Sequence, residues 1–366
     1  CDNVPMTALF AGLTTLDVLH RLDHAPDPTV KVTSTGFTMA AGGPATNAAV
    51  TYAALCAASR RAAASAESPS FSVAPGSRAG EPSVERGAES GDAPLLLTAL
   101  GEGPVAAFLA ADLACAGVRV ADATARAQPS SDGNDEGTAA ASSSARVPAV
   151  SSIIEHPEGR MVASTNARLD VEAARIAPLL PTRVGVVLVD GHNPSLAHEA
   201  LTLSMERVEE DDPFALLEAE VPHPRILDGG SWKDWLTSLL GLVDIAVVSE
   251  DFCPPVMARP NGEQVADFLR GFGITRTVRT RGERSVQYWW DGARGEVPVR
   301  RVEDSSTLGA GDAFHGAFAW AIERAGDADP EAIIRFASAV AGVSVSSFGT
   351  RRWRASPELE ELVRGW

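Results

Sequence analysis

Residues 306–326, STLGAGDAFHGAFAWAIERAG, place a small-residue turn and an acid directly before a long apolar stretch with helical spacing. A helix N-terminus carries unpaired N–H groups and about half a positive charge, and glycines ahead of it let an anion come close. Gly309, Ala310 and Gly311 meet that need, and Asp312 follows them. A carboxylate beside a phosphate is useful when it accepts a proton from an incoming hydroxyl while the N–H groups stabilise the phosphoryl group. The segment therefore indicates a phosphotransfer site.

The same segment also has an ordinary structural explanation, in which the glycines form a tight turn and Asp312 caps the helix. Four residues alone do not separate the two interpretations. A second glycine cluster, MAAGGPATNAAV over residues 39–50, lies upstream and again precedes a helical pattern. The two clusters together favour phosphotransfer.

The composition of the whole chain favours a small ligand over nucleic acid. Its 366 residues carry a formal net charge of −17, whereas sequence-independent binding of nucleic acid relies on Lys and Arg. Hydrophobic residues make up 45% of the chain, which is enough for a large core. No run of about 18 apolar residues is present, and the first residues lack a basic segment followed by an apolar core. We therefore expect a cytoplasmic protein without a membrane segment or secretory signal.

The elements that must hold these clusters follow an alternating pattern. Short apolar runs such as VGVVLVDG and VDIAVVSE alternate with helical patterns such as ATNAAVTYAALCAA. Such alternation is typical of a mainly parallel sheet with helices on both faces. We therefore predict a single α/β domain over residues 1–366, built on a doubly wound sheet.

Two further kinds of segment differ from this pattern. KVTSTGFTMA and VPAVSSIIEHPEGRMVAST alternate apolar and polar residues as exposed antiparallel strands do. They predict a small sheet that forms a lid over a cleft, with strands within approximately residues 14–40 and 146–168. Residues 58–93 and 123–145 are rich in Ala, Ser, Gly, Pro and charged residues, which predicts flexible surface insertions without chemistry of their own.

Taken together, these motifs resemble the ribokinase-like (PfkB) family of sugar kinases. The resemblance covers most of the chain outside the two insertions, through FAGLTTLDVL, GGPATNAAV, LLLTALGEGPVAAFLAADLACAGV, TLGAGDAFHGAF and RFASAVAGVSVSSFGTRR. It implies a doubly wound α/β domain with a small β-sheet lid that often forms a homodimer interface. It also implies ATP and Mg²⁺ as cofactors and a small sugar as the acceptor.

The resemblance assigns roles on the acceptor side by position. Asp17 matches the acid that holds sugar hydroxyls, and Gly43 and Asn47 match the glycine and asparagine of the substrate motif. Asp312 matches the catalytic base, and the small residues before it match the anion hole. A turn residue, a glycine at a helix start and a polar group inside a helix would also explain Asp17, Gly43 and Asn47. The joint pattern favours the functional roles.

On the nucleotide side, the resemblance implies four further contacts. TRTVRTRGERS stands where the family has a strand and a Thr-x-Gly turn, so Thr280 and Gly282 are candidates for ATP contact. A plain junction of strand and turn would explain them as well. Ser338, in RFASAV, stands where relatives often carry an asparagine near the adenine, and Gly349 follows in the matching loop.

The chain departs from the family at positions that matter for cations and for the sugar. Ser306 stands where relatives commonly have an acid that helps build a monovalent-cation site, which leaves K⁺ activation open. VVSEDF replaces the usual Asn-x-x-Glu run, so Glu250 and Asp251 either serve Mg²⁺ through water or are two solvent-facing acids. Pro44 stands where ribokinase itself usually has lysine, which weakens ribose as the substrate.

Several basic residues bear on the choice of sugar. GGPATNAAV, Lys31 and GAGDAFHGAF look more like the branch that includes sulfofructose kinase, and they share features with ketohexokinases. Lys31 matches a lysine that approaches the anionic end of the sugar in that branch, and Arg168 and Asn166 could line the same pocket. All three could equally be solvated residues of the lid. Lys233 follows an expected strand end, where either a ligand contact or a surface position would explain it.

We therefore expect an ATP- and Mg²⁺-dependent kinase that phosphorylates a hydroxyl, preferably a primary one, of a small sugar or sugar derivative such as fructose or sulfofructose. Two alternatives remain open. A nucleoside kinase of the same family would need apolar or aromatic surface for a base, and aromatic residues make up just 6% of the chain. A sugar-binding regulatory protein that has lost phosphotransfer would explain the departures at Ser306 and around Glu250.

Overall fold

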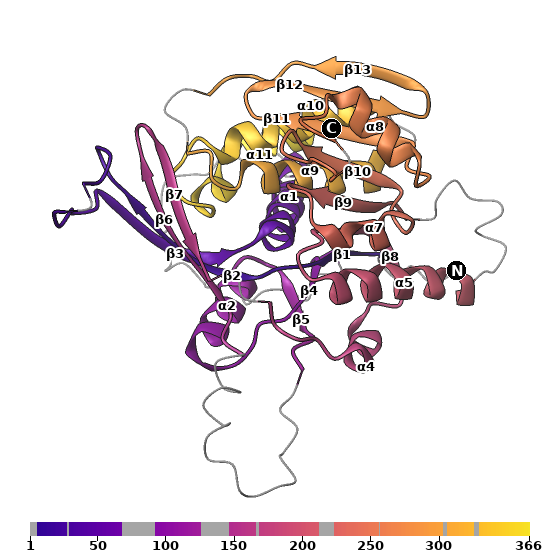
Figure 1. The fold of residues 1–366 in the computed structure, drawn as a ribbon, viewed down its shortest axis with the longest axis horizontal. Coiled ribbons are helices and arrows are strands. Elements are labelled where there is room, and N and C mark those ends of the chain that lie inside the picture. Colours follow the sequence, from indigo (N-terminus) through magenta and orange to yellow (C-terminus); the bar gives the residue numbers. More distant parts are fainter. Residues whose placement is uncertain are drawn as a thin grey trace, which may run out of the picture.

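The computed structural model describes residues 6–27, 29–67, 92–125, 146–165, 168–211, 223–255, 257–302, 306–325 and 329–366. Over these residues the chain forms a nine-stranded sheet with helices on both faces and a separate four-stranded sheet (Figure 1). The doubly wound α/β fold with a small second sheet, which the sequence predicts, is therefore confirmed.

The large sheet is parallel over most of its width. In spatial order its strands are β13 (Ala293–Val297), β12 (Arg284–Trp290), β11 (Arg276–Arg281), β10 (Ile245–Ser249), β9 (Arg225–Gly229), β8 (Val184–Val189), β1 (Thr7–Ala11), β4 (Leu95–Thr98) and β5 (Arg119–Asp122). Neighbours from β11 to β5 are parallel, whereas β12 and β13 are antiparallel additions at one edge. Central parallel strands such as β8, VGVVLV, and β4, LLLT, are largely apolar because both of their faces are covered.

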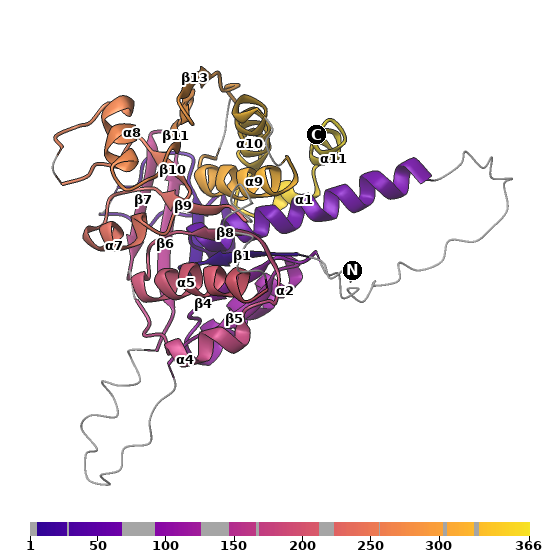
Figure 2. The ribbon, with the colours of Figure 1, turned by 90° about the vertical axis from the view of Figure 1, so that its right-hand side faces the viewer.

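Helices cover the sheet on both sides, as Figure 2 shows. One apolar core lies under α1 (Pro44–Glu67), α2 (Gly103–Cys115), α9 (Ala310–Ala325), α10 (Pro330–Ser344), η3 (Arg352–Ala355) and α11 (Pro357–Arg364). The other lies under α4 (Ala173–Ile176), η1 (Ala177–Leu179), α5 (Pro194–Asp211), η2 (Asp234–Leu236), α7 (Thr237–Leu240) and α8 (Gly262–Arg270). Successive residues of a strand point to opposite faces of the sheet. Phe10 therefore packs in the first core and its neighbour Leu9 in the second. None of the described helices has the length and apolarity needed to cross a bilayer.

The small sheet contains β3 (Gly36–Gly42), β2 (Thr15–Arg21), β6 (Ala149–His156) and β7 (Gly159–Ser164), in that spatial order. β3 and β7 pair antiparallel with β2 and β6, but the central pair of β2 and β6 is parallel. The expectation of purely antiparallel strands is therefore wrong for this pair. The physical reason is that β6 joins the sheet after the chain has passed through α1, β4, α2 and β5, so no tight turn sets its direction.

The two segments expected to be surface insertions are described in part. Helix α1 continues through Glu67, so the expectation is wrong for residues 58–67. Alanine has the highest helix propensity, and Ala58 and Ala62 are buried, so this stretch extends the packed helix. Residues 68–91 and 126–145 lie outside the described residues.

Candidate active site

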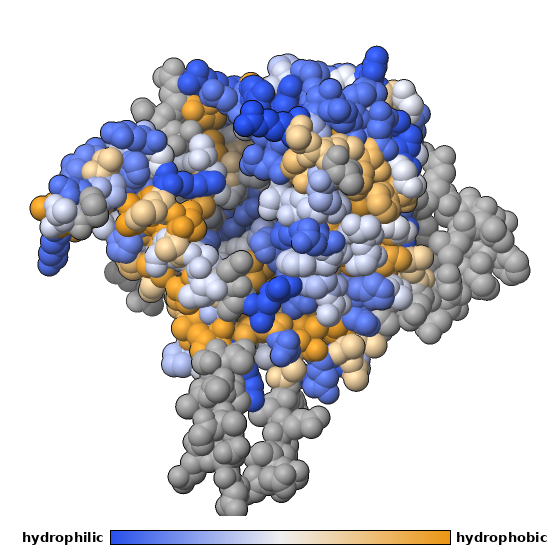
Figure 3. All heavy atoms as spheres, in the orientation of Figure 1, coloured by the Kyte–Doolittle hydropathy of each residue, from blue (hydrophilic) through white to orange (hydrophobic). Residues whose placement is uncertain are grey.

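The order of the large sheet reverses at β1. The chain runs from β1 through β4 to β5 on one side, and from β8 through β9 and β10 to β11 on the other. In open α/β sheets, ligands bind outside the carboxyl ends of the strands at such a point. β1 ends at Ala11 and β2 begins at Thr15, so the small sheet starts at this edge. Figure 3 shows the surface hollowed between the small sheet and the main body.

The GAGD turn begins helix α9 with bare backbone. Gly309 has a φ of +76°, and its carbonyl accepts the Ala313 N–H at 2.8 Å. A Cβ atom on Gly311 would meet no other atom within 4 Å. The first N–H groups of a helix have no partner inside it. The turn therefore combines unpaired donors with open space, which suits a phosphate.

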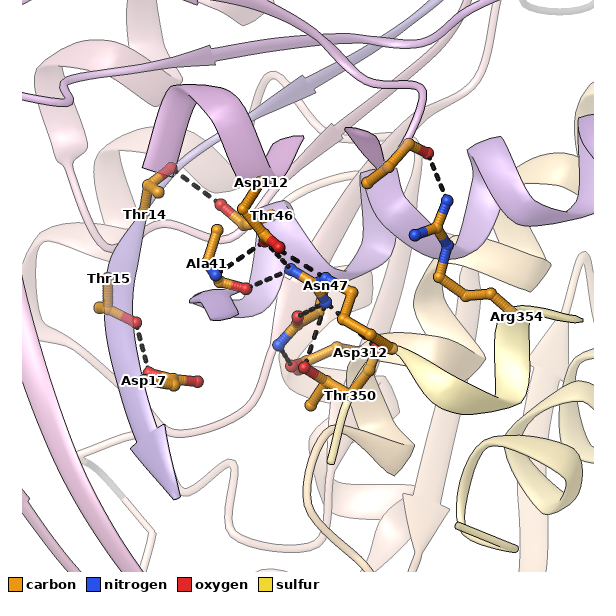
Figure 4. A network of polar contacts seen from close by, with 12 residues as sticks. Thr14, Thr15, Asp17, Ala41, Thr46, Asn47, Asp112, Asp312, Thr350 and Arg354 are labelled. Atoms are coloured by element: carbon orange, nitrogen blue, oxygen red, sulfur yellow. Dashed lines mark hydrogen bonds and ion pairs between the residues drawn. The ribbon is translucent and has the colours of Figure 1, made fainter. Parts of the chain in front are cut away.

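Asn47 connects the two glycine clusters of the sequence. It lies in the first turn of α1, and its side-chain amide donates to the Asp312 carboxylate at 2.8 Å (Figure 4). Asp312 lies in the first turn of α9. The two glycine-preceded helices therefore begin side by side, and their side chains meet.

The environment of Asp312 suits proton transfer. Burial raises the pKa of Asp312 to about 7, and the carboxylates of Asp228 and Asp17 act in the same direction. The Asn47 hydrogen bond and the nearby His315 act against this rise. A carboxyl group that titrates near neutral pH can both take and return a proton, which is the requirement for a general base.

Asp17 lies on β2 with its carboxylate toward the space that Asn47 and Asp312 border (Figure 4). The Thr15 hydroxyl donates to it at 2.6 Å. Burial raises the pKa of Asp17, against the effects of Thr15 and the Arg351 charge. Asp17 thus places a buried carboxylate beside the space that Asn47 and Asp312 border.

Gly43 contributes its backbone to the structure. It has a φ of +104°, and a Cβ atom there would overlap the Leu13 carbonyl oxygen. Only glycine combines this conformation with so close an approach. Gly43 therefore lets α1 begin directly against the link between β1 and β2.

Arg351 joins the elements around Asn47, and the sequence analysis missed it. Its guanidinium donates to the Asp112 carboxylate at 3.1 and 3.3 Å and to Asn47 Oδ1 at 3.3 Å. It also donates to the Ala41 carbonyl, whose own N–H donates to Asp112 at 2.9 Å. The available signal was Asp112, the one charged residue in the apolar segment GPVAAFLAADLAC of α2.

Two buried titratable residues, also missed by the sequence analysis, lie behind Asp312. Asp228 is in β9 and His315 is in α9, and each residue is 4% exposed. Nδ1 of His315 lies 3.3 Å from the Asp228 carboxylate. A lone histidine within the apolar run FHGAFAWA was the sequence signal for this contact.

The candidate nucleotide contacts occupy several places. Thr280 lies at the carboxyl end of β11, in register with Ser249 of β10, and its hydroxyl donates to the Val248 carbonyl at 3.4 Å. Gly282 has a φ of +62° in the turn between β11 and β12, where a Cβ atom would meet nothing within 4 Å. These residues share an edge of the sheet with the residues that follow β10.

A pocket of about 610 Å³ lies between α10, α11 and the segment after β13. Ser338 lines it together with Arg300 and Arg335, and the buried Ser338 hydroxyl has no hydrogen-bond partner among the described residues. Gly349 is elsewhere, because a Cβ atom on it would lie 3.0 Å from the Thr38 side chain of β3. The structure thus gives Ser338 a place in a pocket and sets Gly349 against the small sheet.

The basic residues expected near the sugar differ in position. Lys31 is exposed in the connection between β2 and β3. Arg168 lies 4.4 Å from the Trp235 ring centre and lines a small pocket beside Thr14. Lys233 is half-buried, and its charge acts on Asp228. Residue 166 lies outside the described part of the chain.

The candidate cation residues form no ready metal site. Glu250 pairs with Arg284, and Asp251 is exposed. No group of three His, Cys, Asp or Glu side chains gathers as a metal site among the described residues. The Ser306 hydroxyl donates to Glu155 of β6 at 2.9 Å. These residues fit a Mg²⁺ ion that arrives with nucleotide phosphates and keeps its waters, since Mg²⁺ seldom uses an all-protein cage.

The sequence is similar to known carbohydrate kinases. Residues 214–356 match the family described as pfkB family carbohydrate kinase. Ribokinase of Bacillus subtilis (strain 168) is 26% identical over 197 residues, which are 49% of this chain and 64% of the relative. The match thus spans less than two thirds of that relative.

Solved structures share the fold. Ribokinase from Giardia lamblia has a TM-score of 0.68 at 13% identity, covering 99% of this chain and 100% of that one. Arabidopsis thaliana ribokinase, complexed with ribose and ATP, has a TM-score of 0.64 at 16% identity, covering 99% of each chain. Thermotoga maritima ribokinase has a TM-score of 0.60 at 15% identity, covering 99% of this chain and 100% of that one. The family match over residues 214–356 and these structures agree with each other, and the chain has the ribokinase fold.

Proposed function

We propose that this protein transfers the terminal phosphoryl group of ATP to a hydroxyl group, preferably a primary one, of a small sugar or sugar derivative. The observation that carries the proposal is the 2.8 Å hydrogen bond between Asn47 and Asp312. It joins the glycine cluster at residues 39–50 to the turn at residues 309–311, which suits a phosphate. Both parts of a phosphotransfer site are then within reach of one small molecule.

In this proposal Asp17 and Asn47 orient the acceptor, so that its hydroxyl points at Asp312. Asp312 takes the hydroxyl proton as the oxygen attacks the phosphoryl group, and the N–H groups at the start of α9 stabilise the charge that develops there. Holding the hydroxyl and the phosphoryl group in line supplies much of the rate enhancement, because the reaction between two bound groups is effectively unimolecular. The small sheet excludes water from the cleft, which limits wasteful hydrolysis of ATP.

ATP fits the nucleotide side through Thr280, Gly282 and the pocket that Ser338 lines, with Gly349 as a further candidate. Mg²⁺ bound to the nucleotide would neutralise phosphate charge, and Glu250 or Asp251 would hold its waters. A dependence on K⁺ stays open, because a serine occupies position 306. We place the reaction in the cytoplasm, where ATP is abundant.

A ketohexose such as fructose or sulfofructose is the acceptor that we propose to test first. Arg168 lines a pocket beside Thr14 at the start of the small sheet, which is where the far end of a bound sugar would lie. Lys31 lies in the connection between β2 and β3 of that sheet and would reach an anionic group if this connection closes over the cleft. Both positions would favour a sugar that carries a negative charge.

We also propose that the small sheet pairs with a second copy of the chain. Its outer face exposes Phe37, Met39 and Met161 by 57%, 44% and 53%. The strand register places all three on the face opposite Asp17. Light scattering should then report a dimer, and Phe37→Glu should convert it to a monomer.

The test of function is ATP consumption by the purified protein with ribose, fructose, phosphorylated and sulfonated ketohexoses, deoxy-keto acids and nucleosides. We expect turnover with a ketohexose, dependent on Mg²⁺ and lowered at least about 100-fold in Asp312→Asn. Turnover confined to nucleosides would replace the proposed substrate class. Calorimetric binding of a sugar without turnover of any compound would instead identify a regulatory protein.

A further inference from the structure

The ring of His315 ties the start of α9 to two strands of the large sheet. Nδ1 lies 2.7 Å from the carbonyl oxygen of Gly311, and Nε2 lies 3.1 Å from the carbonyl oxygen of Val247 in β10. Nδ1 is also 3.3 Å from Oδ2 of Asp228 in β9. Both side chains are 5% exposed. Water therefore contributes little to the balance of charge around this ring.

The hydrogen-bond partner of each nitrogen of His315 is a backbone carbonyl oxygen. A carbonyl oxygen has no proton to donate, and a neutral imidazole has a single N–H. A neutral ring would hold one nitrogen lone pair against a carbonyl lone pair in buried surroundings, where an unsatisfied polar group is costly. The doubly protonated ring satisfies both carbonyls.

Asp228 supplies the opposite charge. Its Oδ2 atom is buried and forms no hydrogen bond within the described residues, and the His315 ring 3.3 Å away is its ion-pair partner. We propose that Asp228 and His315 form a buried pair that holds one proton, carried by the imidazole, directly behind Asp312. The pair positions the turn at residues 309–311 through the hydrogen bond to the Gly311 carbonyl. Because the pair has no net charge, Asp312 does not lie beside an unpaired Asp228 carboxylate.

The charges around the pair agree with one shared proton. Burial raises the pKa of Asp228 to about 8, with the Asp190 carboxylate acting in the same direction and Lys233 against it. Burial lowers the pKa of His315, while the two carbonyls and Asp312 act against that change. Coupled groups titrate as a unit, so we assign these opposite shifts to one proton that the pair shares. The two carbonyl acceptors decide that it resides on the ring.

The existence of the pair does not depend on the proposed function, but its role beside a catalytic base does. Nitrogen-15 NMR of histidine-labelled protein, recorded from pH 6 to 9 without ligands, tests the pair directly. We expect both ring nitrogens of His315 to be protonated at pH 7, and one to lose its proton as the pH rises toward 9. The signal is assigned by its loss in His315→Gln. If that variant fails to fold, the signal that changes in Asp228→Asn identifies it.

A His315 ring with one unprotonated nitrogen at pH 7 in the unaltered protein would overturn the pair. In Asp228→Asn the counter-charge is gone, so we expect the ring to lose one proton at pH 7. The exposed His198 serves as the internal control, and its signal should not change. A ring that keeps both protons in Asp228→Asn would also contradict the proposal.

Kinetics separate this positioning role from a merely structural one. We expect Asp228→Asn to lower kcat by about tenfold while the KM values change less than about threefold, because neither partner touches substrate. Unchanged kcat in Asp228→Asn would overturn the positioning role. The two proposals also fail separately, since a protonated ring in a protein without turnover refutes the kinase, and a neutral ring in an active enzyme refutes the pair.

Discussion

Helices α1 and α9 both begin after a glycine in the left-handed region, but their N-termini differ in what fills them. Gly43 has a φ of +104° before α1, and Gly309 has a φ of +76° before α9. At α1 the Asp190 carboxylate accepts the Ala45 N–H at 3.2 Å and also the Leu13 N–H at 2.9 Å. At α9, a Cβ atom on Gly311 would meet nothing within 4 Å.

This difference shows that a glycine cluster at a helix start predicts an anion site but does not identify the anion that occupies it. A helix N-terminus favours a negative charge in either case. The first site is filled by a carboxylate that lies 145 residues along the chain from Ala45. The second is open beside Asp312, where a ligand's phosphate would fit. The structural helix start and the proposed catalytic one therefore share a local pattern.

The largest effect should come from the carboxylate at the open helix start. Asp312→Asn keeps the shape of the side chain and a partner for Asn47, but it removes the proton acceptor. We expect kcat to fall about 10²- to 10⁴-fold, while calorimetry shows ATP and sugar binding within a fewfold of the original. Near-normal turnover in this variant would remove Asp312 as the base.

The filled helix start should respond to change through stability. In Gly43→Ala the new Cβ would overlap the Leu13 carbonyl oxygen in a conformation that L-residues rarely adopt. We expect the free energy of unfolding to fall by about 2–4 kcal/mol, measured by urea denaturation. The control is Gly103→Ala at the first residue of α2, where φ is +90° but the Cβ would meet nothing within 4 Å. Equal losses in the two variants would show that the close approach at Gly43 is unimportant.

The open helix start should respond through nucleotide use. In Gly311→Ala the methyl group meets no protein atom, so the fold should keep its stability. The group would occupy the space proposed for the phosphate, and we expect kcat/KM for ATP to fall about 10- to 100-fold. Thermal denaturation checks the fold, and steady-state kinetics at varied ATP checks the site. An unchanged kcat/KM would place the phosphate elsewhere.

Local patterns predicted the fold and the two helix starts, because strand and helix periods act over a few residues. Residues 58–67 were misassigned since their alanine-rich composition suits a surface insertion as well as a helix. The parallel pairing of β2 with β6 depends on the path of the intervening chain, which periodicity does not record.

Local sequence patterns could not predict the contacts that complete the candidate site, because their partners are far apart in the sequence. Arg351 meets Asp112 across 239 sequence positions. Nothing in the spacing of either residue reveals the partner, although an acid within an apolar helix signals that one exists. His315 gave the same kind of signal, a polar residue in an apolar run, without showing that Asp228 and the Val247 carbonyl would surround it. Polar residues at apolar positions are thus the best sequence guide to such contacts.

The smallest effect that should distinguish the two helix starts is one of pH. Because the pKa of Asp312 is raised to about 7, its carboxyl is mostly protonated below that value and cannot accept the hydroxyl proton. We expect kcat/KM for the sugar to rise with pH through about 7 and to be about tenfold below its plateau at pH 6. Circular dichroism at each pH controls for unfolding, and the residual rate of Asp312→Asn should lack this rise. A flat profile between pH 6 and 8 would mean that the open helix start does not hold the titrating base, which would leave both helix starts with purely structural carboxylates.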